Sequence, residues 1–138
     1  MAQMLEANAV PSGAVQLSPL TLTPAVVELL EGRMDALVLA SAPESPMVQM
    51  LLQTPGIALF DFVQSEAYAR RFAFMSAAVL PRGVVNLAAD QPPTDVHLVA
   101  PTASLLAREG LHPALVQLFM QAATRVHGEA GWFQRKGE

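Results

Sequence analysis

The chain has 138 residues, of which 52% are hydrophobic and 14% charged; this composition excludes an intrinsically disordered chain and is enough for one compact domain. A net charge of -4 without a basic run excludes phosphate-driven nucleic-acid binding, and the absence of cysteine excludes disulfides and thiol chemistry. No uninterrupted apolar stretch approaches the ~18 residues of a membrane helix, so no membrane span is predicted.

The first third of the chain predicts two helices and two strands. Residues 2–8 can form a short helix, and the alternation over 15–20 is typical of a short strand. Thr23, followed by proline, has the pattern of a helix start, and Gly32 that of a helix end. The apolar run 34–40 is too short for a helix and favours a strand buried on both faces.

The middle of the chain repeats this pattern. Ser45, again followed by proline, predicts the start of a helix running to about Gln53. A second buried strand is predicted over 57–62, then a helix capped by Ser65, then an extended segment over 77–87. Alternating strands and helices imply an α/β fold, with a mostly parallel sheet flanked by helices.

The last third contains a proline-rich segment and a long helix. Residues 90–96 resemble a linker and are predicted to act as a hinge within a single domain of residues 1–138. An extended segment is predicted over 95–106. A strongly amphipathic helix is predicted over 112–127, with Gly128 at its end.

Residues able to carry chemistry are few and scattered. His97, His112 and His127 lack the spacing of metal ligands, so no metal is predicted, and the His97 nitrogens are expected to find backbone partners on a strand. Ser41 follows a predicted strand, but its neighbours lack the glycines of a nucleophile elbow. Because no glycine-rich phosphate loop is present either, we expect neither an enzyme nor a cofactor.

Anion binding is the remaining candidate chemistry. In open α/β sheets, ligands bind beyond the carboxyl ends of the strands, where amides at a helix start attract a carboxylate. The loop before the predicted helix at Ser45 has this position, although it can equally be a tight loop with a capping serine. Tyr68 can offer a phenol at the same rim or pack against the fold. The predicted ligand-binding residues are Ser41, Ala42, Pro43, Ser45, Asp61 and Tyr68.

The order of these motifs resembles a known superfamily. The run from Thr23 to Ala36, an aliphatic helix followed by glycine, a basic residue, an apolar residue and Asp-Ala, resembles type 2 periplasmic solute-binding proteins. The turn 81–83 and the segment 111–115 extend the likeness to the TAXI family of TRAP transporter receptors, over about residues 5–138. The resemblance implies a three-layer α/β sandwich lobe, with the receptor loop at residues 41–43 and the hinge at about 94–96.

This resemblance implies a function. The chain would be the second lobe of an extracytoplasmic receptor that captures a small carboxylate or amino acid against a first lobe outside this sequence. It would deliver this solute to TRAP membrane permease subunits from a periplasmic location, anchored if at all through segments outside this chain. Two alternatives stay open: a cytoplasmic effector-sensing domain of a transcription regulator, and a self-associating interaction domain that forms a homodimer in isolation.

Overall fold

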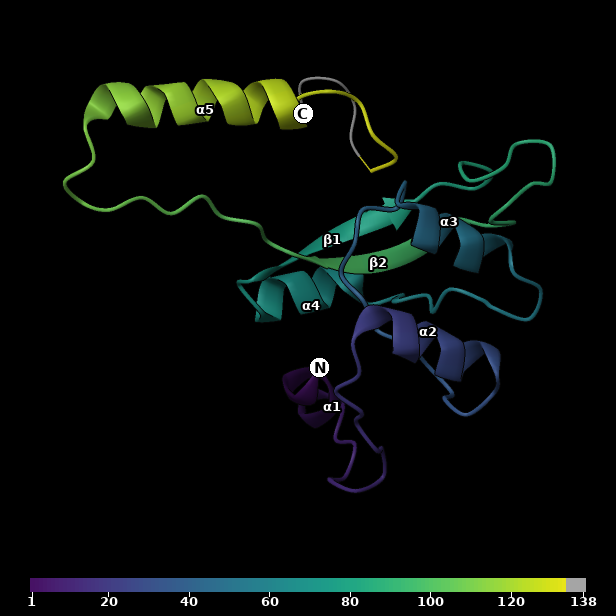
Figure 1. The fold of residues 1–138 in the computed structure, drawn as a ribbon. Coiled ribbons are helices and arrows are strands. Elements are labelled where there is room, and N and C mark those ends of the chain that lie inside the picture. Colours follow the sequence, from purple (N-terminus) through teal and green to yellow (C-terminus); the bar gives the residue numbers. More distant parts are fainter. Residues whose placement is uncertain (134–138) are drawn as a thin grey trace. The chain divides into compact units, whose positions relative to one another are not determined.

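The computed structural model describes residues 1–133, which divide into two compact units, residues 1–39 and the chain from residue 40 onward. No helix among these residues is long and apolar enough to cross a membrane. The elements in chain order (Figure 1) are α1 (Ala2–Ala7), α2 (Leu22–Leu30), α3 (Pro46–Gln53), α4 (Ser65–Arg71), β1 (Met75–Leu80), β2 (Val96–Pro101) and α5 (Pro113–His127).

The first unit contains α1 and α2. Helix α2 begins after Thr21, two residues earlier than predicted, so the proline that follows Thr23 lies inside the first turn, where it removes no helical hydrogen bond. Gly32 follows the C-cap residue with a φ of 71°, a left-handed conformation that glycine adopts without strain. The prediction that Gly32 ends this helix is therefore confirmed.

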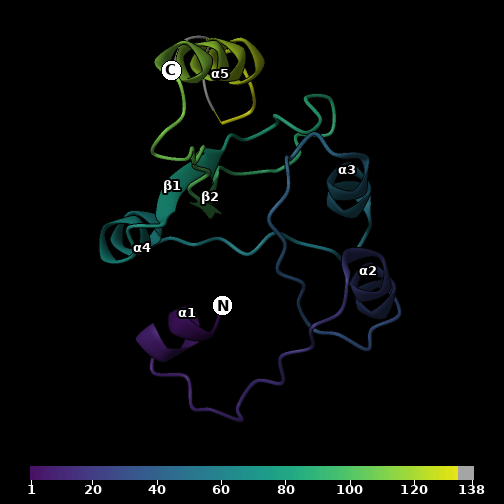
Figure 2. The ribbon, with the colours of Figure 1, turned by 60° about the vertical axis from the view of Figure 1, so that its left-hand side comes forward.

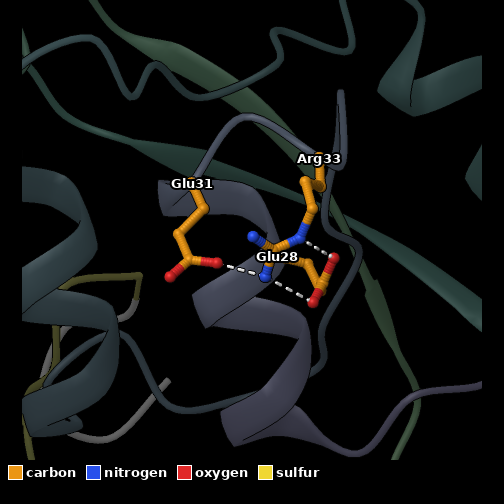
Figure 3. A network of polar contacts seen from close by, with 3 residues as sticks. All are labelled: Glu28, Glu31 and Arg33. Carbon is orange, nitrogen blue, oxygen red and sulfur yellow. Dashed lines mark hydrogen bonds and ion pairs between the residues drawn. The ribbon is translucent and has the colours of Figure 1, made fainter.

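An ion-pair network closes the end of α2. The Arg33 guanidinium donates to both carboxylate oxygens of Glu28, at 2.7 Å from Nε and 2.8 Å from Nη2, and also pairs with Glu31 (Figure 3). The hydrogen bonds from Arg33 hold the pKa of Glu28 below its ordinary value. The network is exposed to solvent, so it fixes the loop after α2 locally and forms no part of a core.

The second unit is built around a small antiparallel sheet. Strands β1 and β2 pair over their whole length, from Met75 opposite Pro101 to Leu80 opposite Val96. Helix α4 packs against both strands (Figures 1 and 2). Leu80, only 2% exposed, and Val96 form the buried centre. Ser65 is buried as well, but it is the first residue of α4 and Gln64 is the N-cap, so the prediction that Ser65 caps this helix is wrong.

The broad α/β class is confirmed, whereas a parallel three-layer sheet is not. Residues 15–20, 34–40 and 57–62, predicted as strands, form no strand. For residues 57–62 the reason is specific. The Asp61 carboxylate accepts the His97 N–H, so one backbone hydrogen bond remains between this segment and β2, from the Phe62 N–H to the His97 carbonyl at 2.8 Å. A side chain thus occupies the position where a ladder would need a carbonyl.

The connection between β1 and β2 is tightly hydrogen-bonded. Arg82 bonds Asp90 through its guanidinium, at 2.7 Å from Nε, and Asp95 through its backbone N–H, also at 2.7 Å. Gly83 donates to the Pro92 carbonyl at 2.9 Å, and the Gln91–Pro92 peptide bond is cis. Of the predicted hinge 90–96, residues 90–95 therefore lie in the loop that joins the two paired strands, and Val96 begins β2.

Helix α5 contrasts with the sheet because none of its side chains is buried. His112 caps the helix, its Nδ1 accepting from the Ala114 N–H at 3.2 Å, and Pro113 occupies the first turn. The preceding segment 105–111 and one side of α5 line a shallow apolar hollow of about 330 Å³. Among the described residues, α5 packs on no other helix or strand.

Candidate functional site

Asp61 and His97 form a polar pair whose geometry is fixed by several contacts with the sheet. Asp61 Oδ1 accepts from the His97 backbone N–H at 2.7 Å and lies 3.0 Å from the ring nitrogen Nδ1. A neighbouring backbone hydrogen bond, from Phe62 to the His97 carbonyl, holds the segment of Asp61 against β2. Three contacts thus fix one carboxylate and one imidazole relative to the sheet.

The geometry of the pair sets the tautomer of the imidazole. An ionised carboxylate only accepts hydrogen bonds, so Nδ1 carries a proton and Nε2 of the neutral ring is an acceptor. Both side chains remain more than two-fifths exposed, which leaves them within reach of a solute. The expectation that the His97 nitrogens find backbone partners is wrong for the ring, whose partner is a side chain 36 residues away.

Aromatic rings form a continuous series beside this pair. Phe60 and Phe62 are in edge contact with centroids 4.7 Å apart, and Phe62 contacts Tyr68 in the same way at 5.9 Å. Tyr68 in turn stacks on Phe72 at 6.3 Å, and Phe72 contacts Phe74 at 5.8 Å. Of the two roles left open for Tyr68, the packing role is present, and its ring reaches the Asp61 segment through Phe62.

The predicted receptor loop forms a compact turn before α3. The Ser41 and Ser45 hydroxyls lie 3.2 Å apart, and Ser45 N–H donates to the Ala42 carbonyl at 3.1 Å. Gln49 on α3 reaches back to the Pro43 carbonyl at 2.8 Å. The side chains predicted to cradle a carboxylate therefore come together, but much of their hydrogen bonding is internal to the loop.

Ser45 also caps α3, as predicted. Its hydroxyl accepts from the Val48 N–H at 3.4 Å, and Pro46 is the first helical residue. The helix ends at Gln53, as predicted. The Ser45 hydroxyl thus caps α3 and also contacts the Ser41 hydroxyl. Ser41 itself does not cap the helix.

The six predicted residues form two groups in the structure. Ser41, Ala42, Pro43 and Ser45 share the loop before α3, whereas Asp61 and Tyr68 lie with the sheet. Within the described part of the chain, no hydrogen bond joins the loop to Asp61. Sequence reasoning missed His97 as a member of the second group, since nothing in its local pattern indicates a partner so distant in the chain.

One further charged cluster lies at the turn after β1. The hydrogen bond from Arg82 holds the pKa of Asp90 below its ordinary value, and Asp90 in turn raises that of Arg82. Both side chains are largely exposed and satisfy each other. Across residues 1–133, no three histidine or acidic side chains gather closely enough to hold a metal ion.

The chain was also compared with known proteins. No protein-family model matches it, and neither a curated protein nor a solved structure is found to be similar. The function of the two groups therefore has to be argued from their own geometry and chemistry.

Proposed function

We propose that this chain is a lobe of an extracytoplasmic solute-binding receptor of the TRAP type, which captures a small carboxylate against a further lobe of the same polypeptide. The observation that carries the proposal is the exposure of apolar segments that belong to no helix or strand. Val38 in the first unit is 68% exposed, and Phe60 in the second is 72% exposed. Contiguous exposed apolar residues mark surfaces that other polypeptide covers.

The proposal includes a three-layer α/β fold for the complete lobe. In a three-layer lobe with a mostly parallel sheet, the segments 34–40 and 57–62 would become strands once further strands are supplied from outside this chain. Both segments have the apolar composition of strands covered on two faces. The resemblance of the motif order to the TAXI family supports the same arrangement.

The solute chemistry follows from the polar groups. Two neighbouring hydroxyls and the first amides of α3 favour a carboxylate in the Ser41–Ser45 loop. At the second group, Nε2 of His97 can donate to a carboxylate only in the protonated imidazolium, because Asp61 already holds Nδ1.

The remaining assignments follow from the receptor role. The partners are TRAP membrane permease subunits and the lobe outside this chain, and the location is periplasmic. Capture needs no covalent step, because a ligand with more contacts in the closed form stabilises closure by that difference.

Thermal unfolding tests the proposal. This chain and the longer gene product are heated with dicarboxylates, amino acids and pyrimidine precursors, and a ligand at a hundred times its dissociation constant adds about 2.7 kcal/mol, a shift of several degrees. We expect a shift in the longer protein and a smaller one, or none, in this chain.

A matched pair of variants locates the solute. Ser41→Ala removes a loop hydroxyl without uncapping α3, and Ser76→Ala removes an exposed hydroxyl from β1. Loss of the ligand shift in the first variant alone supports the loop as the binding site. A panel without any shift in the longer protein contradicts the receptor function.

A further inference from the structure

Helix α5 presents an apolar seam that stays exposed and on which no other helix or strand of the described chain packs. With 3.6 residues per turn, four apolar side chains lie within one narrow stripe along the helix. They are Leu115, Phe119, Ala122 and Val126, and all are exposed. Gln117, Gln121 and Arg125 lie outside this stripe. Most of the stability of a helix of this pattern comes from packing of its apolar face against a partner.

The seam is self-complementary in size. If two copies cross antiparallel about a two-fold axis midway between positions 120 and 121, Phe119 of one copy faces Ala122 of the other. In the same register, Leu115 faces Val126. Each contact thus pairs a large side chain with a smaller one, which is how facing helices interdigitate without voids.

Charge and dipole favour the same antiparallel arrangement. The register places His112 of one helix at the level of Glu129 beyond the end of the other, so no like charges meet at the two ends. In a parallel pair, Arg125 would instead lie beside Arg125 and Glu129 beside Glu129. Antiparallel helices also align their dipoles favourably.

We propose that α5 is a dimerisation helix, which pairs antiparallel with α5 of a second copy of this chain through Leu115, Phe119, Ala122 and Val126. The contact is isologous, so it closes with two copies and leads to no larger assembly. The hollow between residues 105–111 and this helix shares Phe119 with the seam and extends the apolar surface to one side of it. This surface is separate from the serine loop and from the Asp61–His97 pair.

Sedimentation and light scattering of the full chain between about 1 and 200 μM test the pairing, over the range of dissociation constants that a small interface allows. The informative variant is Ala122→Glu, which buries a charge at the centre of the seam, and its control is Gln121→Glu, the same charge one residue away on the polar side. We expect the first to weaken dimerisation by about 100-fold or more and the second by less than about threefold. Because neither residue is buried in the chain, both variants should keep the helical circular dichroism of the wild type.

Engineered disulfides test the relative direction of the two helices. The chain has no native cysteine, so each introduced cysteine can pair only with another introduced one. In the antiparallel register, two Ala122→Cys residues are offset by about 4.5 Å along the axis, and two Leu115→Cys residues by about 16 Å. We expect Ala122→Cys to form a homodimeric disulfide, Leu115→Cys to form none, and an equimolar mixture of Leu115→Cys and Val126→Cys to cross-link with each other.

Three outcomes overturn the proposal. A monomer at every concentration means that α5 is covered in another way, for example by another segment of the natural polypeptide. A dimer that survives Ala122→Glu places the contact elsewhere. Efficient self-cross-linking of Leu115→Cys means that the helices run parallel.

Discussion

The sheet of the second unit and helix α5 are both rich in apolar residues but have opposite environments. In the sheet, Leu80 and Val96 face each other across two paired strands on which α4 packs, and both are buried. In α5, the backbone satisfies its own hydrogen bonds but no side chain is buried. Hydrophobic content therefore locates a core only where a second element is available to cover it.

The largest expected effect compares a buried with an exposed leucine. Leu80→Ala leaves a cavity in the sheet and should lower the free energy of unfolding by about 2–5 kcal/mol. Leu118→Ala, at a side chain that is 59% exposed on α5 and outside the seam, should change it by less than about 0.5 kcal/mol. Urea unfolding followed by circular dichroism measures both, and equal effects would remove the contrast between the two regions.

A smaller effect is expected at the loop before α3. Ser45→Ala removes the hydroxyl that accepts the Val48 N–H and should cost about 1 kcal/mol. The control Ser41→Ala removes the neighbouring hydroxyl, which caps nothing, and should cost clearly less. Thermal unfolding of the pair ranks them, and a larger loss in Ser41→Ala would contradict the assignment of Ser45 as the cap.

The link between Asp61 and His97 should contribute a similar or slightly smaller amount. Asp61→Ala removes the acceptor of the His97 N–H in an exposed setting, with an expected loss of about 0.5–1 kcal/mol. Nitrogen NMR of the imidazole gives a more direct measurement, because the wild type should carry its neutral-state proton on Nδ1 and the variant should shift towards the Nε2 form. Asp61→Asn is the control, since its amide oxygen can still accept. An unchanged tautomer in Asp61→Ala would argue against the pair.

The smallest expected effect is a pH dependence in the connection between β1 and β2. The pKa of Asp90 is lowered in the folded chain, so its pairing with Arg82 stabilises this loop above the ordinary carboxyl pKa of about 4, and the contribution is lost as pH falls through the lower, folded value. Carboxyl NMR titration should find the pKa of Asp90 closer to its ordinary value in Arg82→Gln. The control is Glu28, whose lowered pKa depends on Arg33 and should not respond.

The helix ends were the most predictable features of the fold. Ser45 followed by proline marks the start of α3, and Gly32 the end of α2, because capping depends on residues within one turn of each other. The serine loop was predictable for the same reason, since Ser41 and Ser45 are four residues apart. Strand pairing was not: residues 57–62 have the composition of a strand, yet Asp61 replaces the backbone ladder with a side-chain hydrogen bond.

The sequence by itself determined the helix boundaries to within about two residues, and which helix is amphipathic, since these properties depend on neighbours within a few residues. Only the tertiary structure decided that β1 and β2 pair antiparallel, that Asp61 holds His97, and that the apolar stripe of α5 stays uncovered within the described chain. Each of these depends on which distant segments come together. An apolar run or a carboxylate has the same local pattern whether or not a partner reaches it.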